Sequence, residues 1–205
     1  ATHLERTRRL KGGQFLSQIT KDFCQAWGIK HTILPMTDSP VRTIVDTDEG
    51  ELAFQEYFVH RRCEPRVKGF RFDGVEIARC ASVVGAREAI ESAEAIVICP
   101  SNPWVSVDPI LQVIPLTPAK RPLSPRQRGW GEGKKVVAVS PIIGGKAVKG
   151  PAAKMYAELG IEPSALAVAE HYRGLLSGFV LDTVDAELSV RIGVRTLITD
   201  TLMNS

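Results

Sequence analysis

The sequence predicts an α/β fold, with a three-layer core around a mainly parallel sheet and a smaller α+β portion. Two continuously apolar runs, Ala95 to Cys99 and Val136 to Val139, are typical of strands that a parallel sheet buries on both faces. Helix and strand patterns also alternate through the C-terminal half, as they do in α/β proteins. We therefore expect the strands near 95–99 and 135–139 to be parallel neighbours, buried on both faces.

The N-terminal portion, residues 1–93, combines helical and hairpin patterns and joins the core. Its first residues form a polar helical stretch, and Phe15 to Trp27 place apolar side chains at helical spacing before Gly28 as a stop. Short β-rich runs flank an acidic turn at 46–50, which predicts a hairpin or a strand-turn-helix. The remaining elements expected here are the runs Val41–Val45 and Glu51–Phe54, an extended piece near Val67–Phe72 and a helix over Gly85–Ala93.

The C-terminal portion, residues 94–205, supplies the α/β core. Proline opens and glycine follows two of its predicted helices, which is the usual asymmetry of helix ends. These helices and the strands after them are Pro151–Leu159, Pro163–Leu175, Phe179–Leu181 and Val194–Ile198.

Residues 115–135 differ from the rest of this core in composition. They hold four of the 13 prolines, and residues 118–135 carry a net charge of +5, which leaves the rest of the chain at −2. We expect a surface insertion, mobile or disordered, with no regular strand or long helix over 116–133. Because the body of the protein is not basic, we expect no nucleic-acid partner.

Several classes of protein are excluded by simple patterns. No apolar run approaches the roughly 18 residues of a membrane span, and we see no signal peptide. The cysteines are scattered without a C-x-x-C pair, which fits a reducing cytosol better than a zinc site. We expect a cytoplasmic protein without a membrane partner. The chain opens without an initiator Met, and we expect it to be part of a longer protein.

Two loops follow the buried strands, where ligands gather in open α/β sheets. In the first, Ser101, Asn102 and Ser106 offer short polar groups to an anion or a sugar, and Asp108 begins a helix whose N-terminal amides attract phosphate. An ordinary strand-to-helix connection capped by Asp108 explains the same residues equally well.

The second loop, residues 140–151, is rich in glycine and lysine. Glycines let backbone amides approach a phosphate, and lysines neutralise it. Neither a Walker A sequence nor a GxGxxG fingerprint is present, and a tight turn with solvated lysines is the alternative. The candidate phosphate-binding residues of this loop are Ser140, Gly144, Gly145, Lys146, Lys149 and Gly150.

Two acidic residues and one polar turn complete the candidates. Asp182 and Asp185 follow a predicted strand and could hold Mg²⁺ or, alternatively, cap a helix. Residues 36–40 form a polar elbow that contains Thr37 and Asp38, either as a plain turn or as a ligand contact. The histidines are isolated in sequence, and we cannot combine them with a nucleophile and an acid.

Several short sequence motifs of this chain occur together, in the same order, in one known family. The chain resembles the 2-phospho-L-lactate transferase family of coenzyme F-420 biosynthesis over nearly its whole length except the insertion. This resemblance implies a Rossmann-like core. The matching motifs are ATHLxRT at 1–7, LPMTDxPVxT at 34–43, FQxYFV at 54–59, CPSNP at 99–103, AVSPIIGGKAVKGPAAKM at 138–155 and PSALxVAxxY at 163–172.

The resemblance implies a Mg²⁺-dependent transfer of a 2-phospholactyl or phosphoenolpyruvyl group. A guanosine diphosphate-activated three-carbon acid would be the donor, the deazaflavin FO the acceptor, and GMP the leaving product. By this resemblance, the serine-asparagine loop and the glycine-lysine loop would contact the nucleotide and diphosphate. From their own chemistry we assign Thr37 and Asp38 as candidate acceptor contacts, and Asp182 and Asp185 as candidate metal ligands. The family's first phosphate loop and Asp-Asp pair would lie upstream, so we expect this chain alone to be nearly inactive.

Two further expectations accompany this interpretation. We leave open a homodimer. The alternative function, from a different class, is a non-catalytic regulator of the gluconeogenesis-factor type that binds a nucleotide or a nucleotide sugar. Binding of FO with GDP, against binding of uridine nucleotides, separates the two.

Overall fold

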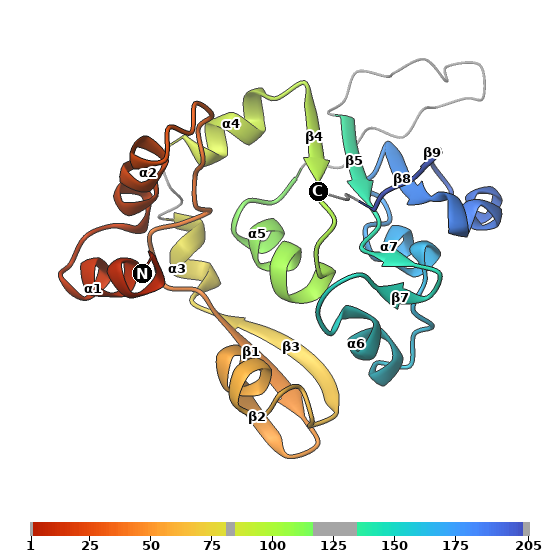
Figure 1. Ribbon diagram of the computed structural model, residues 1–205, viewed down its shortest axis with the longest axis horizontal. Coiled ribbons are helices and arrows are strands. Elements are labelled where there is room, and N and C mark those ends of the chain that lie inside the picture. Colours follow the sequence, from red (N-terminus) through yellow and green to blue (C-terminus); the bar gives the residue numbers. More distant parts are fainter. Residues whose placement is uncertain (1, 81–84, 117–134, 203–205) are drawn as a thin grey trace.

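A computed structural model describes residues 2–80, 85–116 and 135–202 of the chain (Figure 1). Its strands form a four-stranded sheet and, in the described residues, two smaller antiparallel sheets. The predicted insertion lies outside the described residues except for its ends, at 115–116 and 135. No helix in the described ranges is long and apolar enough to cross a membrane.

The four-stranded sheet is parallel throughout and has the order β4-β5-β8-β9. Ile96 of β4 lies opposite Val136 of β5, and Ala138 of β5 lies opposite Phe179 of β8. The α/β fold class and the parallel pairing of the strands near 95–99 and 135–139 are therefore confirmed. The strands are β4 (Ala95–Ile98), β5 (Lys135–Val139), β8 (Gly178–Asp182) and β9 (Arg195–Thr199).

The prediction that the two strands near 95–99 and 135–139 are buried on both faces is wrong, because β4 is open to solvent. Strand β4 lies at an edge of the sheet, and Val97 on it is 61% exposed. Leu197 on β9 is 60% exposed, whereas Val136 and Leu181 are fully buried. Side chains alternate between the two faces of a strand, so one face packs against helices while the other is open in part. A short apolar run cannot distinguish these two situations.

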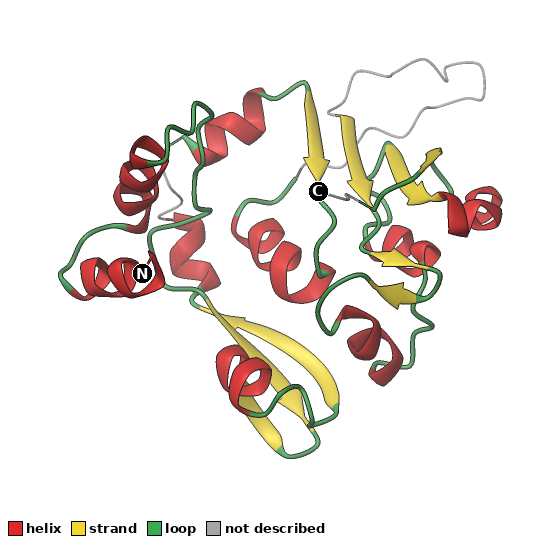
Figure 2. Cartoon of the chain, in the orientation of Figure 1, coloured by secondary structure: helices red, strands yellow, loops and turns green. Residues whose placement is uncertain are grey.

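Helices and helical turns cover the buried face and form the main core with it (Figure 2). Tyr156, Val168 and Tyr172 bring α6 and α7 onto Val136 and Phe179 of the sheet. The helix predicted to run to Leu175 is shorter, because the chain leaves α7 in a turn that passes through Gly174 at a φ of 85°. The elements in this layer are η2 (Pro103–Val107), α5 (Asp108–Val113), α6 (Ala152–Glu158) and α7 (Ala165–His171).

The smaller α+β portion contains an antiparallel sheet in the order β2-β1-β3. The predicted hairpin is confirmed, since Val45 of β1 pairs with Leu52 of β2 and also with Phe70 of β3. We refer to β1, β2, β3 and the helical turn η1 as the hairpin lobe. Its elements are β1 (Arg42–Thr47), β2 (Gly50–Ala53), η1 (Glu56–His60) and β3 (Val67–Asp73).

Four helices accompany the hairpin lobe in the described N-terminal portion. The predicted helices near 15–27 and 85–93 are confirmed as α2 and α4, and Gly28 ends the turn after α2 at a φ of 66°. Helix α3, which follows β3 directly, was not expected. These helices are α1 (Thr2–Lys11), α2 (Leu16–Ala26), α3 (Val75–Cys80) and α4 (Ala86–Ser92).

Apolar clusters join the N-terminal portion to the core. Val45, Tyr57 and Val67 of the hairpin lobe are buried against Met155 of α6. Because Met155 lies one turn after the glycine-lysine loop, this packing places the hairpin lobe beside the candidate site.

Candidate functional site

The two candidate loops leave the same edge of the parallel sheet. Strands β4 and β5 are parallel neighbours, so both chains emerge at the carboxyl ends of the strands, on the side of the sheet toward α6 (Figure 1). We call residues 99–107 the β4 loop and residues 140–151 the β5 loop. This edge is where open α/β sheets bind ligands.

Asn102 shapes the β4 loop with its own side chain. Its Oδ1 accepts hydrogen bonds from the N–H groups of Trp104 at 3.1 Å and Val105 at 3.3 Å, which caps the turn η2. Its Nδ2 donates to Met155 Sδ at 3.1 Å. The predicted role of Asn102 as a phosphate contact therefore competes with a structural one. Within the described residues, the hydroxyls of Ser101 and Ser106 have no such partner.

The β5 loop is built around a small hairpin that the sequence pattern did not predict. Strand β6 (Ile142–Ile143) pairs antiparallel with β7 (Lys146–Ala147). Gly144 and Gly145 connect them at φ values of 54° and 75°, which a two-residue primed turn requires. The glycines thus form the turn, and the alternative prediction of a tight turn is confirmed.

Two more groups of the β5 loop are used inside it. Ser140 is buried, and its Oγ donates to the carbonyl of Ile142 at 2.8 Å while accepting the N–H of the same residue at 3.2 Å. The N–H of Gly144 donates to the Asp185 carboxylate at 3.0 Å and 3.2 Å. Neither Ser140 nor the Gly144 amide is available to a phosphate in this arrangement.

The second half of the β5 loop keeps its polar groups free. Lys146 and Lys149 are exposed, and neither ammonium group forms an ion pair with a described residue. The exposed segment 148–150 makes no backbone hydrogen bond through its amides to the described chain. Two cations and successive open amides form the kind of donor set that binds a phosphate.

The two carboxylates predicted to hold Mg²⁺ do not fit that role as a pair. Asp182 accepts from the N–H of Val184 at 3.0 Å and from the N–H and hydroxyl of Thr201, both at 2.9 Å. These donors hold the pKa of the Asp182 carboxyl below its ordinary value, with the backbone N–H of Thr201 as the largest cause. With Thr183 also donating, its oxygens are occupied, and the residue caps the turn η4 (Thr183–Arg191).

Asp185 is likewise buried and engaged with Gly144. No three His, Cys, Asp or Glu side chains in the described part of the chain come together in a manner that could hold a metal ion. The helix-capping alternative explains Asp182, and Asp185 fastens the β5 loop to the loop after β8.

Thr37 and Asp38, the predicted acceptor contacts, lie in the N-terminal portion and are used locally. The Asp38 carboxylate accepts the N–H and the hydroxyl of Ser17, both at 2.7 Å, and so caps α2 from a distance. Thr37 is buried, and its Oγ1 accepts the N–H of Ser39 at 3.0 Å. Nothing in the structure tests their contact with an acceptor, which stays a prediction.

One pair of residues near the β4 loop was not found from the sequence. His171 Nε2 lies 2.8 Å from Asp108 Oδ1, although 63 residues separate them. The prediction that Asp108 begins a helix is confirmed, and the prediction that His171 is isolated is wrong. No local pattern could have revealed a pair that only the packing of α7 against α5 brings together.

The comparisons with known proteins agree with the resemblance in the sequence. A model of the 2-phospho-L-lactate transferase CofD family matches residues 1–192. The chain belongs to this family. A 2-phospho-L-lactate transferase of Methanosarcina mazei is 40% identical over the full chain, which spans 64% of that protein. A phosphoenolpyruvate transferase of Streptomyces coelicolor is 39% identical over 94% of the chain, which spans 58% of that protein.

A solved structure supports the fold of this family member. A UPF0052-family protein of Bacillus halodurans superposes with a TM-score of 0.58 at 14% identity, over 96% of this chain and 63% of that one. The likeness concerns the fold alone. The chain of this CofD-family member thus spans less than two thirds of the relatives named here.

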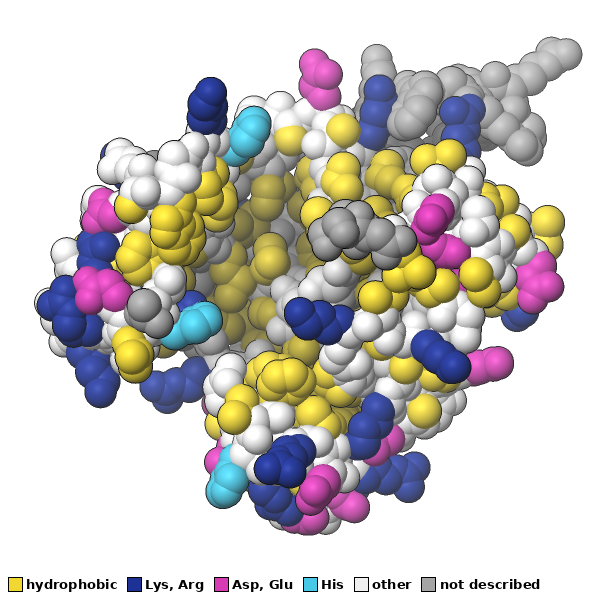
Figure 3. All heavy atoms as spheres, viewed as in Figure 1, with side chains coloured by type: hydrophobic (Ala, Val, Ile, Leu, Met, Phe, Trp, Pro, Cys, Tyr) yellow, Lys and Arg dark blue, Asp and Glu magenta, His cyan; other side chains and the backbone are white. Residues whose placement is uncertain are grey.

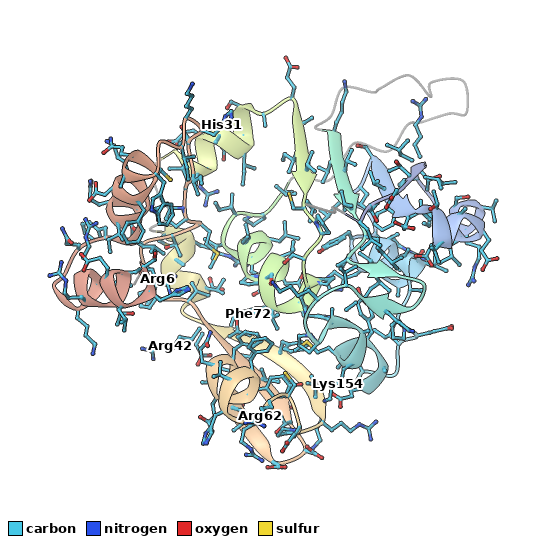
Figure 4. The ribbon with its side chains drawn as sticks, in the orientation of Figure 1. Arg6, His31, Arg42, Arg62, Phe72 and Lys154 are labelled. Atoms are coloured by element: carbon cyan, nitrogen blue, oxygen red, sulfur yellow. The ribbon has the colours of Figure 1, made fainter. Side chains whose placement is uncertain are left out.

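Two polar contacts fasten the hairpin lobe of this family member beside the site. Glu158 Oε2 accepts the N–H of Val67 at 3.0 Å, and Lys154 Nζ donates to the carbonyl of Pro65 at 3.3 Å. Lys154 projects from α6 toward the lobe (Figure 4) and also pairs with Glu158. Both residues follow the β5 loop directly, so the lobe and the loop share one support.

Away from these loops, the face shown in Figure 3 has a hollow lined with hydrophobic side chains. A pocket of about 310 Å³ lies between residues 32–36, α4 and α5. Leu34, Ile90 and Ile110 are among its apolar lining residues. It contains none of the predicted phosphate contacts and is separate from the β4 and β5 loops.

Proposed function

We propose that this chain supplies the nucleotide-diphosphate half of a transferase in coenzyme F-420 biosynthesis. The enzyme would move a 2-phospholactyl or phosphoenolpyruvyl group from a guanosine diphosphate-activated donor to FO and release GMP. Membership of the CofD family supports a transferase, and relatives of similar identity carry the names 2-phospho-L-lactate transferase and phosphoenolpyruvate transferase.

The observation that carries this proposal is the pairing of unlike loops at one edge of the sheet. The β4 loop offers the hydroxyls of Ser101 and Ser106, which have no hydrogen-bond partner among the described residues. The β5 loop offers Lys146, Lys149 and the amides of 148–150, which make no backbone hydrogen bond to the described part of the chain. A diphosphate needs donors and positive charge from more than one side, and two adjacent loops supply both.

In the proposed reaction a hydroxyl oxygen of FO forms a bond to phosphorus, and the bond from phosphorus to GMP breaks as the hydroxyl proton leaves. Such transfers depend on alignment and on neutralisation of charge more than on covalent catalysis. The lysines would neutralise the phosphates, and the serines and loop amides would orient them. The resemblance implies that Mg²⁺ supports the reaction, and magnesium dependence remains a prediction.

A calorimetric titration with GDP tests the nucleotide site directly. We expect Lys149→Ala to weaken GDP binding about ten-fold, since a charge-assisted contact is worth about 1.5–3 kcal/mol. Lys21→Ala, which removes an exposed lysine from α2, is the matched control and should leave the affinity unchanged. Added salt should weaken wild-type binding, because the contacts are exposed.

Titrations with GDP and with uridine nucleotides distinguish the transferase from the non-catalytic regulator. GDP binding with FO-dependent GMP release, measured with the longer protein, would support the transferase. Preferential binding of uridine nucleotides without transfer would favour the regulator. Equal GDP affinity in wild type, Lys149→Ala and Lys21→Ala would contradict the placement of the diphosphate at the β5 loop.

A further inference from the structure

Trp104 is the centre of a group of rings that holds the β4 loop. Its ring lies 4.1 Å from that of Tyr156 on α6, 5.4 Å from that of His171 on α7 and 5.9 Å from that of Phe70 on β3, between ring centroids. Three elements from distant parts of the sequence therefore meet on one side chain of the loop. Aromatic pairs at these separations add specific geometry to their apolar burial.

The far end of the β4 loop is held by the Asp108–His171 pair. Asp108 directly follows the loop, and its Oδ1 lies 2.8 Å from His171 Nε2. Both side chains are mostly buried, with 23% of Asp108 and 18% of His171 exposed. The His171 ring also meets the ring of Tyr172 edge-on at 5.0 Å, so the imidazole has a fixed orientation.

Asp108 also faces the tyrosines of this group. Burial, and then the charge of Asp108, raises the pKa of Tyr156 and of Tyr172. Among the described residues, the hydroxyls of both tyrosines have no hydrogen-bond partner. His171 is thus the residue that directly satisfies the Asp108 carboxylate within the ring cluster.

The loop is consequently fixed at both ends and in the middle. Asn102 caps its start, Trp104 anchors its centre, and the Asp108–His171 pair ties down its end. Ser101 and Ser106, the hydroxyls proposed to orient the diphosphate, lie on this short segment. Displacing a positioning group by even 1 Å can cost a large factor in binding or rate.

We propose that His171 is a positioning residue, which acts through Asp108 and Trp104 to hold Ser101 and Ser106 in place for a nucleoside diphosphate. The ligand in this statement rests on the proposed function, but the ordering of the loop does not. His171 forms no hydrogen bond with Ser101 or Ser106, so we assign it no catalytic role.

The test combines residue-resolved hydrogen exchange by NMR with GDP titration. His171→Phe keeps a ring beside Trp104 and removes the bond to Asp108, and Asp108→Ala removes the same bond from the other side. Both should speed exchange of the Trp104, Val105 and Ser106 amides about five-fold, since such a bond contributes about 1 kcal/mol. We expect GDP binding to weaken by a similar factor of about five.

Two controls distinguish positioning from general stability. His60→Phe breaks the exposed pair of His60 with Glu56, at 2.7 Å on η1, and should change neither quantity. His171→Gln keeps an N–H donor and should restore much of the protection and of the affinity. Exchange of the paired amides of β1 and β3 should stay at the wild-type rate in every variant.

Unchanged exchange of the β4-loop amides in both His171→Phe and Asp108→Ala would overturn the proposal. So would faster exchange spread evenly over the hairpin lobe and the β5 loop, because that result indicates a loss of global stability. If wild-type protein binds no GDP, the proposed function fails, yet the exchange rates still decide whether His171 orders the loop.

Discussion

The β4 loop and the β5 loop leave neighbouring strands at the same edge of the sheet, but they hold their shapes by different means. Side chains fix the β4 loop, through the Asn102 cap, the Trp104 rings and the Asp108–His171 pair. Backbone conformation fixes the β5 loop, through two glycines at positive φ and one carboxylate from elsewhere. The difference shows that residue types suited to phosphate binding also build loops.

This comparison explains which polar groups remain for a ligand. In the β4 loop, Asn102 is hydrogen-bonded inside the loop, and Ser101 and Ser106 have no hydroxyl partner among the described residues. In the β5 loop, Ser140 and the Gly144 amide are hydrogen-bonded, and Lys146 and Lys149 form no ion pair within the described ranges. A site assembled from both loops therefore has hydroxyls on one side and cations on the other.

The largest effect should come from the side-chain anchor of the β4 loop. Trp104→Ala removes a half-buried ring with three aromatic neighbours, and we expect a loss of about 3 kcal/mol in the free energy of unfolding. Trp27→Ala is the matched control, because Trp27 is 59% exposed and stacks only on Phe23 among the described rings. Urea denaturation measures the free energy of unfolding of both variants. Equal losses in Trp104→Ala and Trp27→Ala would contradict an anchoring role of the rings around Trp104.

A smaller effect should come from the backbone turn of the β5 loop. Gly144→Ala forces a Cβ into a positive-φ position, where it would also meet Val184 Cγ1 at 3.2 Å. We expect a loss of about 1–2 kcal/mol. Gly69→Ala is the control, since Gly69 lacks a positive φ and no atom of the described residues lies within 4 Å of the added Cβ. Thermal unfolding of both variants checks the prediction.

The contrast between the two loops would fail if Gly144→Ala and Gly69→Ala had the same stability. Equal stability of Gly144→Ala and wild type would mean that the turn does not depend on glycine. In that case the glycines of the β5 loop would be free to serve a ligand, as the sequence first suggested.

The smallest effect we expect is a pH dependence at the next loop along the edge. The Asp182 carboxyl has a pKa below its ordinary value, because Thr201 and Val184 donate N–H groups to it. A lowered folded-state pKa adds stability above the unfolded-state pKa, and this stability is lost as the pH falls toward the folded-state pKa. Asp182→Asn should therefore be less stable than wild type near neutral pH.

This difference should shrink as the pH falls through the acidic range below about pH 4, where wild-type Asp182 becomes protonated. Asp46→Asn, which changes an exposed carboxylate on β1, is the control. Denaturant titrations at several pH values measure the difference. A gap between wild type and Asp182→Asn that stays constant over this range would argue against a role for the charge.

Much of the fold was predictable because it depends on local patterns. Helical spacing around Ile19, the hairpin at the acidic turn and the parallel pairing of the β4 and β5 runs each follow from a few adjacent residues. Burial on both faces was not predictable, since it depends on what covers Val97 and Leu197 rather than on the strands themselves.

The site was predictable only in part, for the same reason. The free lysines and the shared edge of the sheet followed from composition and order. The bond from Gly144 to Asp185 spans 41 residues, and that from His171 to Asp108 spans 63. Such contacts arise from packing of whole elements, and they decided which polar residues were already occupied.

Hydrogen exchange with and without saturating GDP tests the central claim, that the β4 and β5 loops form one diphosphate site. We predict that GDP slows exchange in residues 99–107 and 146–150 together, and leaves the turn at 46–50 unchanged. Protection of only one loop, or of neither while GDP binds, would contradict a shared site at this edge of the sheet.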